Sequence, residues 1–541
     1  MQFNLADLFE AVADAVPARE AVVDGDTRRT YVALDERATR LAHVLRNAGV
    51  EPGEHVGCFM RNSIAHVETM LACYKLRAVP INVNYRYVDE ELAYLFDDAD
   101  VVAVVHDAEF ATTVERVRKT SDGVRLALDT RDGYEEAVGA ASADRDFGTR
   151  SADDRYVLYT GGTTGMPKGV VWRHEDIFFA AMGGGNPGGP PIARPEEIVP
   201  SVLDNAAQRL RPFLPADDPG PPQFISLALG PLMHASGQWS AFGTLLGGGK
   251  VVLYDAPSVD MTQVLDLIAR ERINALNLVG DTSARPLLAA LDANRNRSDT
   301  SSLRLLGSGG SILSGEVKDA LMATLPSVLA IVEGIGSSES PAQAVALTTR
   351  SGTASESLTF AAKPETMVVD DELRPIARGS SEVGRLATRG RVPLGYYKDE
   401  ARSARTFVEI DGARWSLPGD MASIDVDGSV HLLGRGSMCI NTGGEKVYPE
   451  EVEAVLTTHT QIDDAVVVGM PDSQWGQRVV AIVTATPGLA APDLESVQAH
   501  CRGRLAGYKL PRAMRVVDHV ERNPAGKVDY GWARAVAAWS G

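Results

Sequence analysis

The chain has 541 residues, more than one hydrophobic core usually serves, so we expect at least two domains. Hydrophobic residues make up 44% and charged residues 23% of the sequence, ordinary values that exclude a largely disordered, collagen-like or disulfide-stapled protein. Lys and Arg number 53 against 72 Asp and Glu, a net charge of −19. A surface this negative repels nucleic acid and anionic lipid, so a phosphate site must be local, built from backbone N–H groups and a few cations.

The cellular location is predicted from the cysteines and the N-terminus. The four cysteines, Cys58, Cys73, Cys439 and Cys501, form no Cys-x-x-Cys pair, as expected in a reducing cytosol. Residues 1–16 have the apolar spacing of an amphipathic helix and not the pattern of a signal peptide. Every apolar run is shorter than the ~18 residues that a membrane helix needs. We therefore expect a cytoplasmic protein without a transmembrane segment.

The first half alternates helical patterns with short apolar runs, which is typical of an α/β protein with a largely parallel sheet. The apolar spacing predicts helices over residues 31–48, 63–76 and 261–271. Runs rich in Val, Ile and Leu predict strands over residues 55–60, 101–106, 224–229, 250–253 and 275–279.

Two later stretches differ from this pattern. Residues 183–222 are rich in Gly and Pro around one short helical piece, which is typical of a linker or of an insertion over a pocket mouth. From Val383 many turns separate strand-like runs, including a predicted hairpin at DVDGSV (425–430). The C-terminal part is predicted to contain one helix and two strands, over residues 449–456, 465–470 and 479–485. We place the domain boundary near Arg435, which gives domains of residues 1–435 and 436–541.

Lysine is scarce, with 10 Lys against 43 Arg, so lysines within glycine loops stand out. Lys168 lies in TGGTTGMPKG (160–169) and Lys527 in NPAGKVDY (523–530). In the first loop, glycines let the backbone aim N–H groups at phosphate oxygens, threonines add donors, and Lys168 supplies charge. It is not a Walker loop, because Pro167 precedes the lysine and β-branched residues follow, so the loop should join two strands. A Gly-rich hairpin without a ligand is the less favoured alternative.

From this loop onward the sequence resembles the adenylate-forming (ANL) superfamily, which includes acyl-CoA synthetases, peptide-synthetase adenylation domains and luciferases. The resemblance covers nearly the whole chain, in order, through PLMHASG (231–237), GSGGS (307–311), GSSE (336–339), WSLPGD (415–420), GR (434–435), INTGGEKVYPEEVE (440–453) and NPAGK (523–527). It implies an α/β fold with a large N-terminal domain of layered α/β subdomains and a β-barrel-like part. It also implies a small mobile α+β C-terminal domain, with a hinge at Ser437.

The resemblance further implies which residues bind ATP and AMP. They are Thr160, Gly161, Gly162, Thr163, Thr164, Gly165, Lys168, Ser308, Gly309, Gly310, Ser311, Glu333, Gly334, Ile335, Gly336, Ser337, Ser338, Asp420, Arg435 and Lys527. The implied catalytic side chains are Lys168, Glu339, Lys527 and His234.

Several of these roles have a physical reason and a simpler alternative. Glu339 is assigned to Mg²⁺, because a carboxylate beside a triphosphate is tolerable mainly with a metal cation between them; in isolation it would be an exposed loop glutamate. Asp420, assigned to the ribose, could cap a turn, and Arg435 could form a surface ion pair. Lys527, otherwise a solvated surface lysine, would place a cation between the attacking carboxylate and the α-phosphate.

The acyl and CoA sites rest on the resemblance alone. His234, Gly237 and Trp239 are the implied acyl pocket, with Gly309 a further candidate wall, although a histidine near apolar residues is more often packed in a core. After the C-terminal domain rotates Lys527 away, the implied CoA-binding residues face the site, namely Gly443, Gly444, Lys446 and Trp475.

The sequence departs from the superfamily pattern at three positions. Ser437 stands where Asp or Lys is usual at the hinge, Ile335 where an aromatic residue is common, and Pro418 where Thr usually precedes Gly-Asp. None of these changes removes a charged catalytic group.

The expected function is that of an AMP-forming acyl-CoA synthetase, an acid–thiol ligase that uses ATP, Mg²⁺ and CoA. Residues 183–222 and 434–453 look most like bacterial CoA ligases for steroid side-chain acids, with medium- or long-chain fatty acids as second choice. The alternatives are an adenylation enzyme that loads a carrier protein, a luciferase-like oxidase and a non-catalytic nucleotide-binding sensor. No nucleic-acid partner is expected, and a homo-oligomer is left open.

Overall fold

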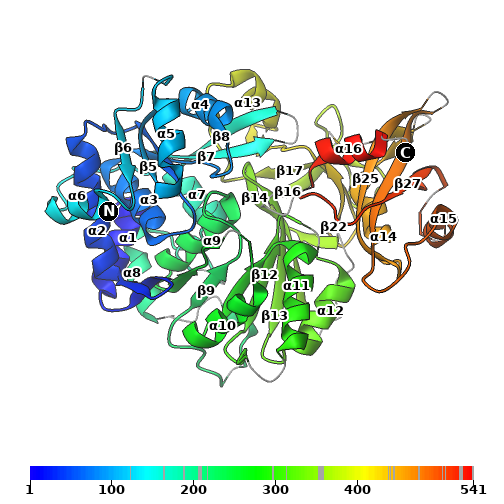
Figure 1. Ribbon diagram of the computed structural model, residues 1–541, viewed down its shortest axis with the longest axis horizontal. Helices are drawn as coiled ribbons and strands as arrows, with labels where there is room; N and C mark the ends of the chain where they lie inside the picture. The colour runs from blue at the N-terminus through cyan, green and yellow to red at the C-terminus, as the bar shows by residue number, and fades with distance from the viewer. Residues whose placement is uncertain are drawn as a thin grey trace.

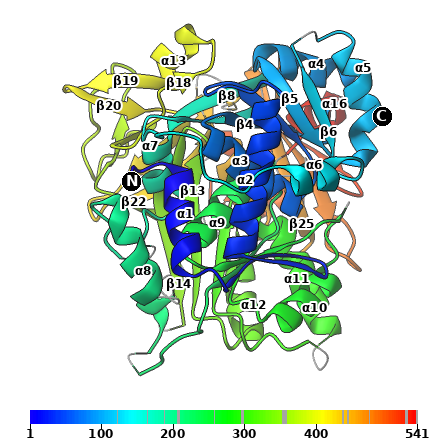
Figure 2. The ribbon, with the colours of Figure 1, turned by 90° about the vertical axis from the view of Figure 1, so that its left-hand side faces the viewer.

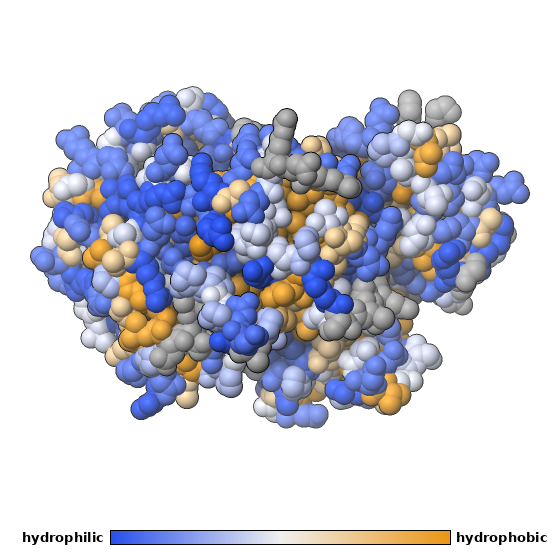
Figure 3. All heavy atoms as spheres, turned by 90° about the horizontal axis from the view of Figure 1, so that it is seen from below, coloured by the Kyte–Doolittle hydropathy of each residue, from blue (hydrophilic) through white to orange (hydrophobic). Residues whose placement is uncertain are grey.

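The structure, a computed structural model, describes residues 1–541 except 122, 163–164, 187–188, 205–209, 216, 257, 295–297, 312, 351–358, 436–437, 439, 443–444, 473–474, 503, 506, 523–527 and 539–541. Four β-sheets organise the described residues into a broad N-terminal body and a smaller C-terminal body beside it (Figure 1). Seen from below, the surface is mostly hydrophilic, as the charge predicts, with hydrophobic side chains gathered near the middle (Figure 3).

The first sheet is fully parallel, in the order β4-β3-β5-β6. Its strands are β3 (His55–Phe59), β4 (Val79–Asn82), β5 (Val101–His106) and β6 (Leu126–Asp129). The surrounding helices are α2 (Tyr31–Asn47), α3 (Ile64–Leu76), α4 (Asp89–Asp98), η1 (Ala108–Phe110), α5 (Ala111–Arg118) and α6 (Tyr134–Ala140). Parallel strands are covered by helices on both faces, which explains the unbroken apolar run of β5.

Capping side chains explain where the first helices begin. The helix α1 (Leu5–Ala15) starts after Asn4, whose side chain accepts a hydrogen bond from the Ala6 amide. Thr30 and Ser63 cap α2 and α3 in the same way. The predicted N-terminal amphipathic helix is thus confirmed, and its apolar face is buried. The face of the N-terminal body turned toward the viewer in Figure 2 carries α1, α2 and α8 (Ile198–Asp204).

The second sheet has 15 strands in the order β19-β20-β17-β21-β22-β15-β14-β13-β12-β11-β9-β10-β1-β2, with β16 paired to β17. Its parallel strands are β1 (Glu20–Asp24), β9 (Ile225–Ala228), β10 (Lys250–Leu253), β11 (Ala275–Leu278), β12 (Leu305–Gly309) and β13 (Ala330–Ser337). The edge strand β2 (Thr27–Thr30) is antiparallel to β1. The helices between these strands are α9 (Ala235–Leu246), α10 (Met261–Glu271), α11 (Gly280–Ala293) and α12 (Gly315–Thr324). The predicted α/β alternation is confirmed.

The remaining strands of this sheet are antiparallel. They are β14 (Ser340–Thr349), β15 (Thr359–Ala362), β16 (Thr366–Val369), β17 (Gly384–Arg389), β19 (Phe407–Ile410), β20 (Ala413–Ser416), β21 (Asp420–Ile424) and β22 (Ser429–Arg435), with α13 (Glu400–Thr406) before β19. The hairpin predicted at residues 425–430 joins β21 to β22. Asp411 and Gly412 both have positive φ in the turn between β19 and β20, as a two-residue type I′ turn requires.

The third sheet has the order β18-β8-β7 and is antiparallel. Its strands are β7 (Arg155–Gly162), β8 (Gly165–Arg173) and β18 (Gly395–Tyr396), and α7 (His174–Ala181) follows β8. The prediction that the glycine loop joins two strands is confirmed. In the Gly/Pro-rich stretch, η2 (Pro195–Glu197) precedes α8 and η3 (Arg211–Phe213) follows it. Because α8 packs against α1, the described part of this stretch is docked on the N-terminal body.

The fourth sheet forms the C-terminal body, in the order β24-β23-β26-β25 with β27 parallel to β26. Its elements are β23 (Ile440–Thr442), β24 (Glu445–Val447), α14 (Pro449–Leu456), β25 (Ile462–Asp472), β26 (Gly476–Ala485), α15 (Leu494–Arg502), η5 (Gly507–Lys509), β27 (Ala513–Val516) and α16 (Tyr530–Ala538). The change of sheet falls between β22 and β23; the exact domain boundary at residue 435 stays a prediction. Among the described residues, no helix is long and apolar enough to cross a membrane.

Candidate active site

The glycine-rich loop lies at the end of the β7–β8 hairpin. Thr160 pairs with Lys168 and Gly162 with Gly165 across the two strands. A Cβ atom on Gly169 would lie 2.7 Å from the Tyr159 ring, so the hairpin can pack this closely only with glycine there. Thr163 and Thr164 lie outside the described residues, and their predicted phosphate contacts stay predictions.

Lys168 and Glu339, which are 171 positions apart, meet directly. The Lys168 Nζ atom donates to Glu339 Oε1 at 3.0 Å and to the Tyr396 hydroxyl at 2.9 Å. The Tyr396 hydroxyl in turn donates to Glu339 Oε1 at 2.6 Å. The Lys168 and Glu339 side chains are 24% and 7% exposed, so this pair is largely shielded from water. The structure therefore brings together the predicted phosphate-loop lysine and the predicted metal carboxylate.

Tyr396 is a residue of the site that the sequence analysis missed. Its strand β18 is joined to β8, with the Tyr397 amide donating to the Gly169 carbonyl at 2.8 Å. Burial, and then the neighbouring Glu339 carboxylate, raise the pKa of Tyr396 well above its ordinary value, so the phenol stays protonated at neutral pH. The only local signal was a Gly-Tyr-Tyr run, which has no distinctive spacing.

The turn that carries Glu339 is held from several sides. The Trp172 indole donates to the Ser338 carbonyl at 3.0 Å, and the Ser416 hydroxyl donates to the Glu339 carbonyl at 3.0 Å. The Ser337 hydroxyl accepts from the Glu339 amide at 3.2 Å. These bonds tie the β13–β14 turn to β8 and β20, so the carboxylate is presented by a fixed backbone.

The predicted adenine segment, residues 307–311, lies at the carboxyl end of β12, beside β13. Ser308 pairs with Glu333 and Gly309 with Gly334 across these parallel strands. Gly310, which follows β12, has a φ of +83°, and Ser311 comes next. In open α/β sheets, ligands bind outside the carboxyl ends of parallel strands. The structure thus brings the two predicted nucleotide segments side by side.

Two predicted nucleotide-binding residues have their side chains in packed surroundings. Glu333 accepts a hydrogen bond from the Lys318 ammonium at 2.9 Å, and both side chains are buried. Burial raises the pKa of Glu333. Ile335 packs into an apolar cluster with residues of the antiparallel strands. Gly336 approaches β14 so closely that a Cβ atom would lie 2.2 Å from the Pro341 carbonyl oxygen.

Asp420 and Arg435, the predicted ribose and hinge contacts, are cross-strand neighbours. Asp420 opens β21, Arg435 ends β22, and the two residues pair in register. Asp420 is 7% exposed; the Arg435 side chain lies outside what the structure describes. A Cβ atom on Gly434 would lie 1.9 Å from Glu450 Oε2, so α14 of the C-terminal body packs against the end of β22.

His234 and the acyl segment are fixed by two asparagines, Asn82 at the end of β4 and Asn62 in the loop between β3 and α3. The Asn82 side chain donates to the carbonyls of Tyr159 and Met233 at 2.8 and 2.7 Å and accepts from the Tyr159 amide at 2.7 Å. It thereby ties β7, at the residue before Thr160, to the residue before His234. Asn62 accepts from the Leu232 amide at 2.7 Å. Periodicity alone could not single out either asparagine.

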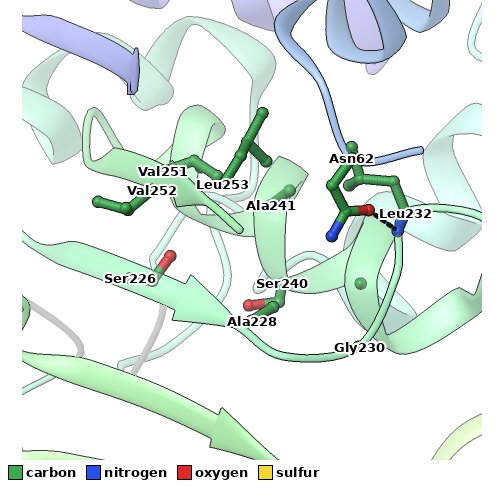
Figure 4. Close-up of a pocket in the computed structure, with 11 residues that line it drawn as sticks. Asn62, Ser226, Ala228, Gly230, Leu232, Ser240, Ala241, Val251, Val252 and Leu253 are labelled. Atoms are coloured by element: carbon green, nitrogen blue, oxygen red, sulfur yellow. Dashed lines mark hydrogen bonds between the residues drawn. The ribbon is translucent and has the colours of Figure 1, made fainter. Parts of the chain in front are cut away.

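Gly237 lines a small pocket, and the other residues that line it are labelled in Figure 4. It is lined by residues of α9, by the ends of β9 and β10, and by Asn62. Its cavity volume is about 10 Å³, room for about one water molecule and far below the roughly 300–1,000 Å³ of sites for drug-sized ligands. Trp239, the other predicted wall residue, is partly buried against the large core cluster of the N-terminal body.

The predicted CoA and hinge residues are described only in part. Lys446 pairs with Asn441 in the β23–β24 hairpin, and Trp475 is 44% exposed. Gly443, Gly444, Ser437 and Lys527 lie outside the described residues. The roles predicted for all these residues stay predictions.

Comparisons with known proteins agree with this geometry. Residues 9–397 match the family model "AMP-binding enzyme", and residues 451–527 match "AMP-binding enzyme C-terminal domain". The chain is 41% identical over 550 residues to a 3-oxocholest-4-en-26-oate–CoA ligase of Rhodococcus rhodochrous, covering 99% of this chain and 96% of the relative. It is 42% identical over 543 residues to a medium/long-chain-fatty-acid–CoA/3-oxocholest-4-en-26-oate–CoA ligase of Mycobacterium tuberculosis (strain H37Rv), covering 98% and 95%.

Solved structures support the same fold. The anthranilate CoA ligase AuaEII in complex with anthranoyl-AMP matches with a TM-score of 0.83 at 22% identity, covering 99% of this chain and 97% of that one. ATP-bound MatB from Rhodopseudomonas palustris matches with a TM-score of 0.80 at 24% identity, covering 99% of both chains. The two family models cover most of the chain, and the relatives and the fold agree with them. The chain therefore belongs to the AMP-binding enzyme family.

Proposed function

We propose that this protein is an AMP-forming acyl-CoA synthetase, an acid–thiol ligase. It activates a carboxylic acid with ATP to an acyl-adenylate and pyrophosphate, and CoA then takes the acyl group and releases AMP. The observation that carries the proposal is the contact between Lys168 and Glu339 beside the glycine-rich hairpin. A cation and a carboxylate placed together there suit a bound Mg·ATP, because the phosphates attract the cation and the metal binds the carboxylate.

In the first step the chain binds and orients the triphosphate. Backbone amides of the glycine loop and the Lys168 ammonium would hold phosphate oxygens, and Asp420 would hold the ribose. Glu339 would hold Mg²⁺, which neutralises phosphate charge when bound; one protein carboxylate suffices, because Mg²⁺ commonly takes its other ligands from phosphate and water. Lys527 would place its cation between the acid and the α-phosphate.

For the second step we propose that the C-terminal body reorients about Ser437. Gly443 and Gly444 would then face the site, with Lys446 and Trp475 on the CoA side. The adenylate already carries a good leaving group, so positioning the thiol is the main requirement. Movement of the C-terminal body between the two steps agrees with its having its own sheet and its own apolar core, separate from those of the N-terminal body.

The substrate we propose is a bulky apolar carboxylic acid. Both relatives described above are named as ligases of 3-oxocholest-4-en-26-oate, and the mycobacterial one is also named for medium- and long-chain fatty acids. We therefore place steroid side-chain acids first and fatty acids second. The pocket beside Gly237 is too small for such an acid, since its cavity volume is about 10 Å³.

We also propose a cytoplasmic location. Cys58, Cys73 and Cys501 are free and buried, and burial raises the pKa of the Cys58 thiol to about 12. Unpaired buried thiols agree with a reducing compartment.

The test is a panel of acids, from steroid side-chain acids to medium- and long-chain fatty acids, scored for pyrophosphate, AMP and thioester with and without CoA. Thioester formation that depends on both ATP and CoA is expected, with Glu339→Gln as the negative control. Pyrophosphate release without any CoA-dependent thioester would favour a carrier-protein-loading enzyme. Oxygen uptake would favour a luciferase-like oxidation, and ATP binding without turnover of any acid would favour a sensor.

A further inference from the structure

The cluster of Lys168, Glu339 and Tyr396 contains one side chain to which the proposed function gives no task. Lys168 and Glu339 are assigned to different parts of Mg·ATP, yet in the structure they form an ion pair with each other. The ammonium and the carboxylate must therefore separate before metal and triphosphate can enter between them. The hydroxyl of Tyr396 contacts both groups.

We propose that Tyr396 is a positioning residue for Mg·ATP: its hydroxyl keeps the Lys168 and Glu339 side chains in place while the ion pair between them opens. This inference rests on the proposed function. A hydroxyl can accept from an ammonium and donate to a carboxylate at the same time. Tyr396 can therefore stay hydrogen-bonded to both side chains after the ion pair between them breaks.

The contacts to Lys168 do not depend on Glu339. The ammonium lies 2.9 Å from the Tyr396 hydroxyl and 4.2 Å from the centroid of its ring. A cation over an aromatic face is attracted by the ring as well as by the hydroxyl. If Glu339 held Mg²⁺ and no longer paired with Lys168, these two contacts would still hold the Lys168 ammonium.

Tyr396 is itself held firmly enough to act as a fixed point. Its amide donates to the Ser403 hydroxyl at 2.8 Å, and its backbone pairs with Val170 of β8. Tyr396 is 7% exposed, and its ring lies 5.5 Å from the Phe407 ring. A site residue whose own rotamer is locked by packing can orient the groups that bind ligand.

The experiment compares Tyr396→Phe with Tyr397→Phe. The first substitution removes the hydroxyl at the cluster and keeps the ring, its packing and its attraction for the ammonium. The second removes a neighbouring hydroxyl that donates to Asp100 at 2.7 Å, away from Lys168 and Glu339. Calorimetric titration with ATP at several Mg²⁺ concentrations measures how much Mg²⁺ each protein needs for half-maximal binding.

We expect Tyr396→Phe to raise the Mg²⁺ concentration for half-maximal ATP binding by about tenfold or more, because the substitution removes the hydrogen bonds of the hydroxyl to two charged groups. Tyr397→Phe should leave it unchanged. The KM for Mg·ATP in adenylate formation should rise similarly, while thioester formation from supplied acyl-adenylate and CoA stays at the wild-type rate. In a Glu339→Gln background the Mg²⁺ effect of Tyr396→Phe should disappear.

The inference is overturned if Tyr396→Phe leaves the Mg²⁺ dependence unchanged, or if Tyr397→Phe shifts it equally. It is also overturned if adenylation and thioester formation fall by the same factor, since that pattern indicates a general structural defect. Thermal unfolding of each variant identifies such a defect directly. If the wild type binds Mg·ATP but releases no pyrophosphate with any acid, the proposed function fails. The binding titration then still tests whether Tyr396 sets the Mg²⁺ dependence of ATP binding.

Discussion

At Gly237 the absence of a side chain decides the path of the acyl segment. A Cβ atom there would lie 2.3 Å from the Pro231 carbonyl oxygen and 2.7 Å from that of Gly230. Both neighbours are backbone atoms, so they cannot turn aside as a flexible side chain would. The first turn of α9 therefore packs directly on the segment that leads to His234.

We predict that Gly237→Ala destabilises the fold by about 1–3 kcal/mol, because the added carbon forces the backbone to shift in a packed region. The matched control is Gly139→Ala in α6, where a Cβ atom meets nothing within 4 Å. That substitution should stabilise the fold by about 0.5–1 kcal/mol, because alanine loses less backbone entropy on folding. Urea unfolding of both variants measures the difference. Equal effects at the two positions would contradict the close approach at Gly237.

At the scale of elements, the site depends on joints between sheets. The glycine hairpin belongs to the third sheet, Glu339 to the second, and Asn82 ends β4 of the first. Asn82 is 5% exposed, and its side chain links the backbone of β7 to the segment before His234. One carboxamide thus fixes the distance between the phosphate loop and the acyl segment.

We predict that Asn82→Ala costs about 3 kcal/mol in the free energy of unfolding, because three buried hydrogen bonds are lost and their backbone partners stay buried. Displacing His234 relative to the loop should also slow adenylate formation by about tenfold or more. Asn84→Ala is the control, since the Asn84 side chain accepts from the Arg86 amide in an exposed turn. It should cost less than about 1 kcal/mol. A loss in Asn82→Ala no larger than in Asn84→Ala would refute this role.

At the scale of the whole molecule, the core of the N-terminal body holds two histidines that should make its stability depend on pH. His66 and His174 are 0% exposed, and burial lowers the pKa of each to about 4. The His174 ring packs edge-on against Tyr74, and its Nδ1 atom accepts from the Leu5 amide. A neutral imidazole fits these surroundings, and a charged one does not.

We predict that the N-terminal body loses stability as the pH falls from about 6.5 to about 4. In that window these histidines are protonated in the unfolded chain but stay neutral in the folded one, so protonation favours unfolding. Above pH 6.5 this loss of stability is absent. Each histidine should contribute about 2 kcal/mol of loss between pH 7 and pH 5. Denaturant unfolding at the two pH values measures it. His174→Gln should reduce the pH difference, whereas His519→Gln, at a 71% exposed side chain, should not.

Prediction from the sequence succeeded where the cause is local. The helix over residues 31–48 follows from apolar spacing, and the strand–loop–strand form of residues 160–169 follows from Pro167 and the β-branched residues after Lys168. Ile335 shows the limit of this reasoning. Its neighbours in the motif indicate a nucleotide segment, but strand alternation directs its side chain into the apolar cluster of the antiparallel strands.

The sequence by itself determined the order of the motifs, the α/β alternation and the membership in a family, because periodicity, turn chemistry and motif composition act over a few residues. Only the tertiary structure decided that Tyr396, 228 positions from Lys168 and 57 from Glu339, joins them in one cluster. It also decided that Asn82 joins two segments 77 and 151 positions away. Contacts over such separations arise from how sheets pack against one another, and no local pattern encodes that packing.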